Sequence, residues 1–364
     1  MTDKPIWPGA AFATAAALAL MHSSSACSQG FGRNNPPVRL NIKENIEVPA
    51  ADATSTAIVA AAKTFLDTLS AQQKDTALYR FTDNAQRANW SNFPNGAVRR
   101  GGVMVGDLSA AQRSALDALL AVFMSDDGFT NIVQQLTAEE MLRNGRGSGV
   151  NFGRDFYFVS FLGEPSTTAP WMFQFGGHHL AINATVVGPN ISYAPMLTGG
   201  QPMHIRYQGR EIFITERETA AAQAFMDSLN DALEKEAVRS ARPINLLLGP
   251  GRDGTVLAPE GVRGSDLSSQ QKKLLLEVIR ARLGFINDDD FAQKMQIVEA
   301  QLDDTYFGWW GPQGQLGTAY YRVTGPSIVL EYAPQGIRGG TTDHVHAMYR
   351  EPGNDYGALW IGAD

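Results

Sequence analysis

The sequence is poor in cysteine and in long apolar runs, and each shortage excludes a class of protein. Cys27 is the only cysteine among 364 residues, so the chain has neither a disulfide framework nor a cluster of thiolate metal ligands. After the N-terminal segment, no stretch offers the roughly 20 consecutive apolar residues that a membrane-spanning helix needs. We therefore predict no membrane span and no cysteine-based chemistry.

Positive charge is also in short supply. The net charge is −7, and lysine and arginine form no run anywhere in the chain. Such a chain lacks the basic footprint of a nucleic-acid-binding protein. The content of 44% hydrophobic and 18% charged residues is typical of a globular protein, and the length allows a large core without disulfides.

The N-terminus has the pattern of a targeting segment. Lys4 is followed by an alanine-rich apolar run over 10–21 and then by small residues up to Cys27. This order is typical of a secretory signal peptide, so we predict export and assign residues 1–27 to the signal. Cys27 stands where a bacterial lipoprotein is cleaved and lipidated, although Ser24 replaces the usual leucine. A lipid anchor at Cys27 and a free periplasmic or secreted form both stay open.

We expect residues 28–48, which are rich in glycine, asparagine and proline, to form a flexible tether, followed by one domain over 49–364. Within that domain two helix starts, at 106–113 and 266–272, are followed by the same order of predicted elements. These elements are a second helix (127–144 and 289–301), an aromatic strand (156–159 and 306–310) and a further strand region (171–183 and 320–332).

This shared order predicts an internal repeat over about 101–200 and 260–350. The predicted fold class is α+β, with two pseudo-repeated units of helix pairs and antiparallel strands that form one large domain. Pockets favour the seam between such units.

Histidines supply the strongest chemical signal. Four of the six fall in two short segments, His178-His179 and His344-Val345-His346. Alternate residues of a strand share a face, so His344 and His346 point the same way, about 7 Å apart, which suits two imidazoles on one ion. The same rule places His178 and His179 on opposite faces. We favour His179 as a ligand because its face is the more polar one, with His178 as a ligand or a support for the ligands.

Three further residues are candidates for the chemistry. Glu331 lies in an otherwise apolar strand, where a buried carboxylate needs a cation or hydrogen-bond donors, so it is a candidate fourth ligand or general base. Arg350 and Arg322 are candidates to hold an anionic substrate through a guanidinium fork. Pairing with buried aspartate or glutamate is the alternative for both arginines.

Together these residues predict an exported metal-dependent enzyme, a hydrolase or an oxidase, with its histidines at the seam between the repeats. Imidazole ligands suit zinc, copper or iron and do not choose among these divalent ions. The substrate would be a small molecule, with an anion as one option. The alternative is a non-catalytic periplasmic or secreted protein that binds a metal or a small ligand. A metal-free polar pocket at these histidines is a further alternative, and a structural or interaction module is favoured if the four histidines prove dispersed.

Several short stretches resemble a family of domains of unknown function, number 3500, which occurs in bacteria and fungi, often behind an export signal. The matching stretches are Arg87 with Trp90-Ser91 and Pro94, Gly106-Asp107-Leu108-Ser109, Gly176-Gly177-His178-His179-Leu180, Tyr306-Phe307, Glu331-Tyr332, Asp343-His344-Val345-His346 and Pro352-Gly353-Asn354-Asp355-Tyr356-Gly357. Tyr349 stands where the resemblance leads us to expect tryptophan. The resemblance implies one long domain, and it implies no activity.

Overall fold

The computed structural model describes residues 34–143, 151–336 and 343–363. The predicted signal peptide, Cys27 and the first part of the predicted tether lie outside these residues. No helix in the described ranges is both long and apolar enough to span a bilayer.

The helices begin where the sequence offers caps. Ser109 and Ser268, which open the two predicted helix starts, accept hydrogen bonds from the backbone of Gln112 and Gln271, whose side chains bond back to the serine N–H groups. These capping boxes satisfy backbone donors that a helix start leaves free. The α-helices of the described residues are α2 (Ala53–Thr68), α3 (Ala71–Ala77), α4 (Asn84–Arg87), α5 (Ala110–Phe123), α6 (Asp126–Met141), α7 (Glu216–Asp227), α8 (Asp231–Ala237), α9 (Ser269–Leu283), α10 (Asp288–Ala300) and α11 (Ala358–Ile361).

One large sheet runs through the whole molecule. Along its main path the strands are, in spatial order, β1 (Leu78–Tyr79), β3 (Phe158–Leu162), β4 (Trp171–Gly177), β5 (Leu180–Val187), β7 (Met196–Gly200), β15 (Val345–Arg350), β14 (Val329–Pro334), β13 (Tyr320–Thr324), β12 (Tyr306–Trp310) and β10 (Val238–Ser240). Neighbours on this path pair antiparallel, except for the parallel outer pairs β1–β3 and β10–β12.

Shorter strands complete the sheet. β2 (Val103–Met104), β6 (Asn190–Ser192) and β11 (Val262–Arg263) pair with β3, β5 and β12. A separate hairpin is formed by β8 (His204–Tyr207) and β9 (Arg210–Phe213). The single-turn 3-10 helices are η2 (Val105–Asp107), η3 (Arg154–Phe156), η4 (Gly264–Asp266), η5 (Leu302–Asp304) and η6 (Asp355–Gly357). The α+β class predicted from the sequence is confirmed.

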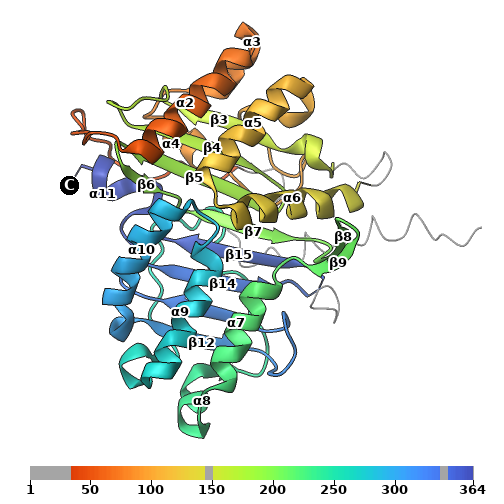
Figure 1. The fold of residues 1–364 in the computed structure, drawn as a ribbon, viewed down its shortest axis with the longest axis vertical. Coiled ribbons are helices and arrows are strands. Elements are labelled where there is room, and N and C mark those ends of the chain that lie inside the picture. The colour runs from red at the N-terminus through yellow and green to blue at the C-terminus, as the bar shows by residue number, and fades with distance from the viewer. Residues whose placement is uncertain (1–33, 144–150, 337–342, 364) are drawn as a thin grey trace, which may run out of the picture.

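The long helices cover one face of the sheet, with α2, α5 and α6 over one half and α7, α9 and α10 over the other (Figure 1). The opposite face is covered by segments with little regular structure, where Trp90 and Leu246 pack in one cluster with Leu197 and Met348 of the central strands. The central strands are therefore buried on both sides, which explains their nearly continuous apolar sequences.

The two halves of the chain present their elements in the same order. In the first half α5 and α6 precede the strands β3, β4, β5 and β7, and in the second half α9 and α10 precede β12, β13, β14 and β15. The sheet order places β7 beside β15, so the two halves meet at its middle. This order is what the predicted internal repeat requires, and the repeat itself stays a prediction.

Part of the predicted tether is bonded to the domain. Asn35 is buried and donates to the carbonyls of Ala88 and Trp90, at 2.8 and 2.9 Å. Ile42 forms a β-bridge with Gly362 near the other end of the chain. The described stretch from residue 34 onward is therefore not a free linker, because its backbone and side chains find partners on the domain surface.

Candidate metal centre

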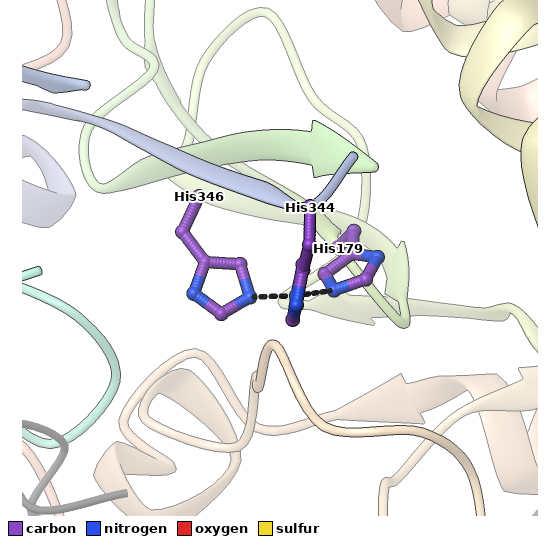
Figure 2. Close-up of side chains that lie close together, drawn as sticks. All are labelled: His179, His344 and His346. Carbon is purple, nitrogen blue, oxygen red and sulfur yellow. Dashed lines mark hydrogen bonds between the residues drawn. The ribbon is translucent and has the colours of Figure 1, made fainter. Parts of the chain in front are cut away.

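Three imidazoles from distant parts of the chain meet at the middle of the sheet. Nε2 of His344 lies 2.8 Å from Nε2 of His179 and 3.2 Å from Nε2 of His346. All three side chains are buried, with exposed fractions of 1 to 4%. Figure 2 shows the three rings turned toward one another, with the strand that carries His346 above them. The sequence-based expectation that the two histidine segments converge therefore agrees with the observed geometry.

His179 reaches this position from a tight turn. Gly177 pairs with Leu180 across β4 and β5, so His178 and His179 are the two residues of the hairpin turn. The sequence analysis placed both in a continuous strand, and that placement was wrong. His179 has a φ of 60°, in the left-handed region that a residue with a side chain seldom occupies. The turn therefore holds His179 in a strained conformation, which structures tend to retain where function needs it.

Tyr157 fixes the outer side of this turn. Its hydroxyl donates to the carbonyl of His178 at 2.6 Å, and its ring lies directly over Gly177. A Cβ added at Gly177 would be 2.9 Å from the ring, so only glycine allows this approach. The backbone that presents His179 is thereby held in place by one hydrogen bond and one close contact.

Of the other two histidines, His346 lies in β15 and His344 directly precedes that strand. His346 pairs with Ala333 of β14 and with Gly199 of β7, and the backbone N–H of Gln335 donates to the carbonyl of His344 at 2.7 Å. A Cβ at Gly199 would lie 2.0 Å from the carbonyl oxygen of Val345, so glycine is needed where the strands approach. The two central strands thus place these imidazoles on a rigid part of the fold.

All three imidazoles are held in the neutral form. Burial lowers the pKa of His179 and of His344 well below the ordinary range, and the neighbouring imidazoles lower both further. Burial, together with His178, lowers the pKa of His346 to about 3. Neutral imidazoles carry the lone pairs that a metal ion requires, so protons do not compete for this centre near neutral pH.

A cation accounts for the geometry better than hydrogen bonds among the rings. A neutral imidazole nitrogen either donates one proton or offers one lone pair, so the Nε2 atom of His344 cannot make good hydrogen bonds to both neighbours. In tetrahedral coordination, three nitrogens about 2.05 Å from one ion are about 3.3 Å apart. The separation of 3.2 Å between His344 and His346 agrees with that value, and the separation of 2.8 Å between His179 and His344 is about 0.5 Å shorter. The three residues could therefore hold a metal ion, and they form one of two such buried groups in the described residues.

The second group consists of Glu139, His178 and His179, so the two groups share His179. Nδ1 of His178 lies 2.9 and 3.1 Å from the two carboxylate oxygens of Glu139, and the rings of His178 and His179 are 3.6 Å apart between centroids. In the centre, Nε2 of His178 and Nδ1 of both His179 and His344 have no hydrogen-bond partner among the described residues. Buried polar atoms without partners are rare, and an ion held by the Nε2 atoms would leave both of these Nδ1 atoms without a partner.

Sequence reasoning missed Glu139 and Arg100. Glu139 lies on α6, and only the packing of that helix against the β4–β5 turn brings it to the histidines. Arg100 is half-buried, and its guanidinium donates to the carbonyl of Gly177 at 3.1 Å. Burial lowers the pKa of Arg100 to about 10, and Tyr157 and Glu139 oppose that shift, so this arginine stays charged near neutral pH.

Asn92 was also missed as a neighbour of the centre. Its amide nitrogen lies 3.3 and 3.4 Å from the two ring nitrogens of His346. The segment that carries Asn92 crosses the face of the sheet opposite the helices. This polar side chain therefore adds to the small polar environment of the three imidazoles.

The structure does not bring Glu331 to the histidines. Its carboxylate accepts hydrogen bonds from the backbone N–H groups of Leu247 and Leu248, both at 2.8 Å, and from the hydroxyl of Tyr320 at 2.7 Å. Burial raises the pKa of Glu331, and these hydrogen bonds oppose the rise. The expectation that a buried carboxylate in this strand needs a cation or hydrogen-bond donors is met by these three donors. The geometry therefore gives no support to Glu331 as a fourth metal ligand or a general base.

The two candidate anion clamps have partners within the protein. Nη1 of Arg350 donates to Asp253 at 2.7 Å and to Asp355 at 2.8 Å, and its other nitrogens donate to backbone carbonyls. Nη2 of Arg322 donates to Glu260 at 2.6 Å. Both arginines therefore follow the alternative expectation, in which they neutralise carboxylates. His204, outside the two histidine segments, is largely exposed and lies 4.0 Å from Asp343.

Comparison with known proteins gives one match. A family model described as "Protein of unknown function (DUF3500)" matches residues 51–358. Neither the curated proteins nor the solved structures give a significant match. The matched span contains every residue of the candidate centre.

Proposed function

Since the chain belongs to the DUF3500 family of proteins of unknown function, no activity follows from its family, and we propose one from the centre itself. The protein holds one divalent metal ion at His179, His344 and His346. It acts as an exported metal-dependent enzyme, either a hydrolase or an oxidase. The observation that carries this proposal is the convergence of three buried Nε2 atoms within 2.8 and 3.2 Å.

The number of ligands favours catalysis. Catalytic zinc sites have three protein ligands and keep one position for water or substrate, whereas structural sites are closed by four. The candidate group contains three residues, and Glu331 is bonded elsewhere. When bound, zinc would supply an activated water, whereas copper or iron would supply redox chemistry. Glu139 and His178 lie where they would support the ligands and balance the charge of the ion.

A non-catalytic metal-binding protein is the second candidate. It is favoured by the burial of the three histidines of the centre, which are 1 to 4% exposed. A catalytic centre, in contrast, must admit a small-molecule substrate, and that substrate could be an anion. The two candidates therefore differ in whether the bound ion keeps a position that an added ligand can reach.

Metal content tests the proposal. Purified protein should contain close to one equivalent of zinc, copper or iron by elemental analysis. The double variant His344→Ala/His346→Ala should contain almost none, because it removes two of the three proposed ligands. The exposed His204→Ala variant serves as the matched control and should retain the metal. Equal metal content in the double variant and the wild type would end the proposal.

Cobalt substitution distinguishes an enzyme from a storage or capture protein. The visible spectrum of cobalt(II) reports its coordination, so protein reconstituted with cobalt should change its spectrum when azide is added, if one position is open. A spectrum that azide does not alter would favour the closed, non-catalytic alternative.

Export is supported by the sequence of residues 1–27 alone. Mass spectrometry of the chain isolated from an expressing bacterium tests it. A mature mass that starts at or after Cys27 supports export, and an added diacylglycerol at Cys27 identifies a lipoprotein. An uncut chain in the cytosolic fraction would contradict the proposal.

A further inference from the structure

A second feature lies at the other end of the central strands, away from the histidines. From His346 to Arg350, β15 runs about 13 Å, and Arg350 borders a cavity of about 620 Å³. Thr324 at the end of β13 and the residues Gly325 and Pro326 that follow it form another side of it. The volume falls within the range of cavities that bind small molecules.

The cavity walls are mainly apolar. Apolar side chains from the N-terminal segment, from the loop at 248–259 and from β14 and its surroundings line it, namely Val38, Leu40, Leu248, Val256, Leu257, Pro259, Pro326, Val329 and Pro352. Polar and charged residues also line it, among them Thr255, Thr324, Arg39, Arg252 and four carboxylates. The apolar walls suit the apolar body of a ligand, and the polar groups orient its polar end.

The floor of the cavity is rigid. The hydroxyl of Tyr356 donates to Asp253 at 3.0 Å and accepts from the indole N–H of Trp90 at 2.8 Å. Tyr356 is fully buried and has a φ of 59°, a conformation that a bulky residue rarely adopts. A strained residue that neighbouring contacts hold in place is often part of a binding site.

The carboxylates around the cavity already have cationic partners. Asp253 and Asp355 are paired with Arg350, and Asp304 is paired with Arg263. Glu351, the remaining one, is paired with Lys294.

Arg39, in contrast, is exposed at the rim and has no ion pair among the described residues. Arg39 therefore offers a positive charge at the rim that no carboxylate of the described residues pairs with.

We propose that this cavity is a second binding site, independent of the metal centre, for a small amphiphilic anion. The apolar body of the ligand lies against the aliphatic and proline walls, and its single carboxylate, sulfonate or phosphate lies at Arg39. Arg350 orders the floor through its two aspartates and does not contact the anion.

Fluorescence titration with 8-anilinonaphthalene-1-sulfonate tests the site, since this probe joins an apolar body to one anionic group. The full chain should bind one equivalent saturably, and a chelator that removes the metal should leave binding unchanged. Thr255→Trp fills the cavity from its exposed side and should abolish binding. Arg39→Met should weaken it about fivefold, as expected for loss of one partly exposed ion pair. The exposed Arg210→Met on β9 is the matched control and should bind like the wild type.

The neutral analogue N-phenyl-1-naphthylamine completes the design. It should bind more weakly than the sulfonate and should not respond to Arg39→Met. Absence of saturable binding, or binding that survives Thr255→Trp, would overturn the site. Equal affinity for both probes would overturn the assignment to anions. Loss of binding on chelation would place the probe at the metal centre and contradict an independent site.

Discussion

Acid should destabilise the metal-stripped protein through the histidines of the centre. The folded state holds these imidazoles neutral, with the pKa of His346 lowered by burial to about 3, whereas the unfolded chain has an ordinary pKa of about 6.5. The unfolded state therefore binds more protons as the pH falls below about 6.5. The contribution of neutral His346 to the free energy of unfolding is therefore complete above about pH 6.5, and it is lost progressively as the pH falls toward 3.

The magnitude for one histidine follows from proton uptake. Between about pH 7.5 and 5.5, an unfolded imidazole with a pKa of about 6.5 gains nearly a full proton, and folded His346 gains almost none. The resulting loss in free energy of unfolding is about 1.4 kcal/mol for this residue. Asp290 acts in the opposite direction, because burial raises its pKa to about 6. Subtracting the result for His346→Gln from that for the wild type cancels the contribution of Asp290, because both proteins contain it.

Urea unfolding in the presence of chelator, at the two pH values, measures the effect. The wild type should lose about 1.4 kcal/mol more than His346→Gln over this interval. His204→Gln is the control and should behave like the wild type, because His204 is largely exposed. If the wild type and His346→Gln lose the same stability, the folded protein protonates His346 readily and the reasoning fails.

Three further predictions follow from individual contacts. Because His179 has a φ of 60°, the His179→Gly variant should have a free energy of unfolding about 1 kcal/mol higher than His179→Ala in urea. Both variants lose the metal, and equal stabilities would contradict the backbone strain at this position. Glu139→Gln should weaken metal binding about tenfold in a chelator competition, because it removes a buried negative charge bonded to His178, and an unchanged affinity would exclude that support. Arg350→Met should lower the free energy of unfolding by about 3 kcal/mol or more, since it leaves two aspartates without their cation; a loss under 1 kcal/mol would show that they are solvated.

The sequence predicted the elements whose signals are local. Ser109 and Ser268 each precede a helix and are followed three residues later by glutamine, so the caps could be recognised before the structure was known. His344 and His346 alternate along a strand, and that spacing alone predicts that their imidazoles meet. The α+β class follows from the same local patterns.

Other features depend on tertiary contacts that no local pattern records. The residues at the turn, His178 and His179, are not typical turn residues, so period-two alternation extended the strand through them. Glu139 reaches the centre only because α6 packs against that turn. Glu331 needed partners, and it found them in the backbone at 247–248, more than eighty positions away in the chain.

X-ray absorption at the metal edge tests the central claim most directly. Purified protein should show three nitrogen neighbours from imidazole at about 2.0 to 2.1 Å and one further oxygen neighbour, and the His344→Ala/His346→Ala variant should show no bound ion. A metal-free protein, or an ion surrounded mainly by carboxylate oxygens, would contradict a centre built from His179, His344 and His346.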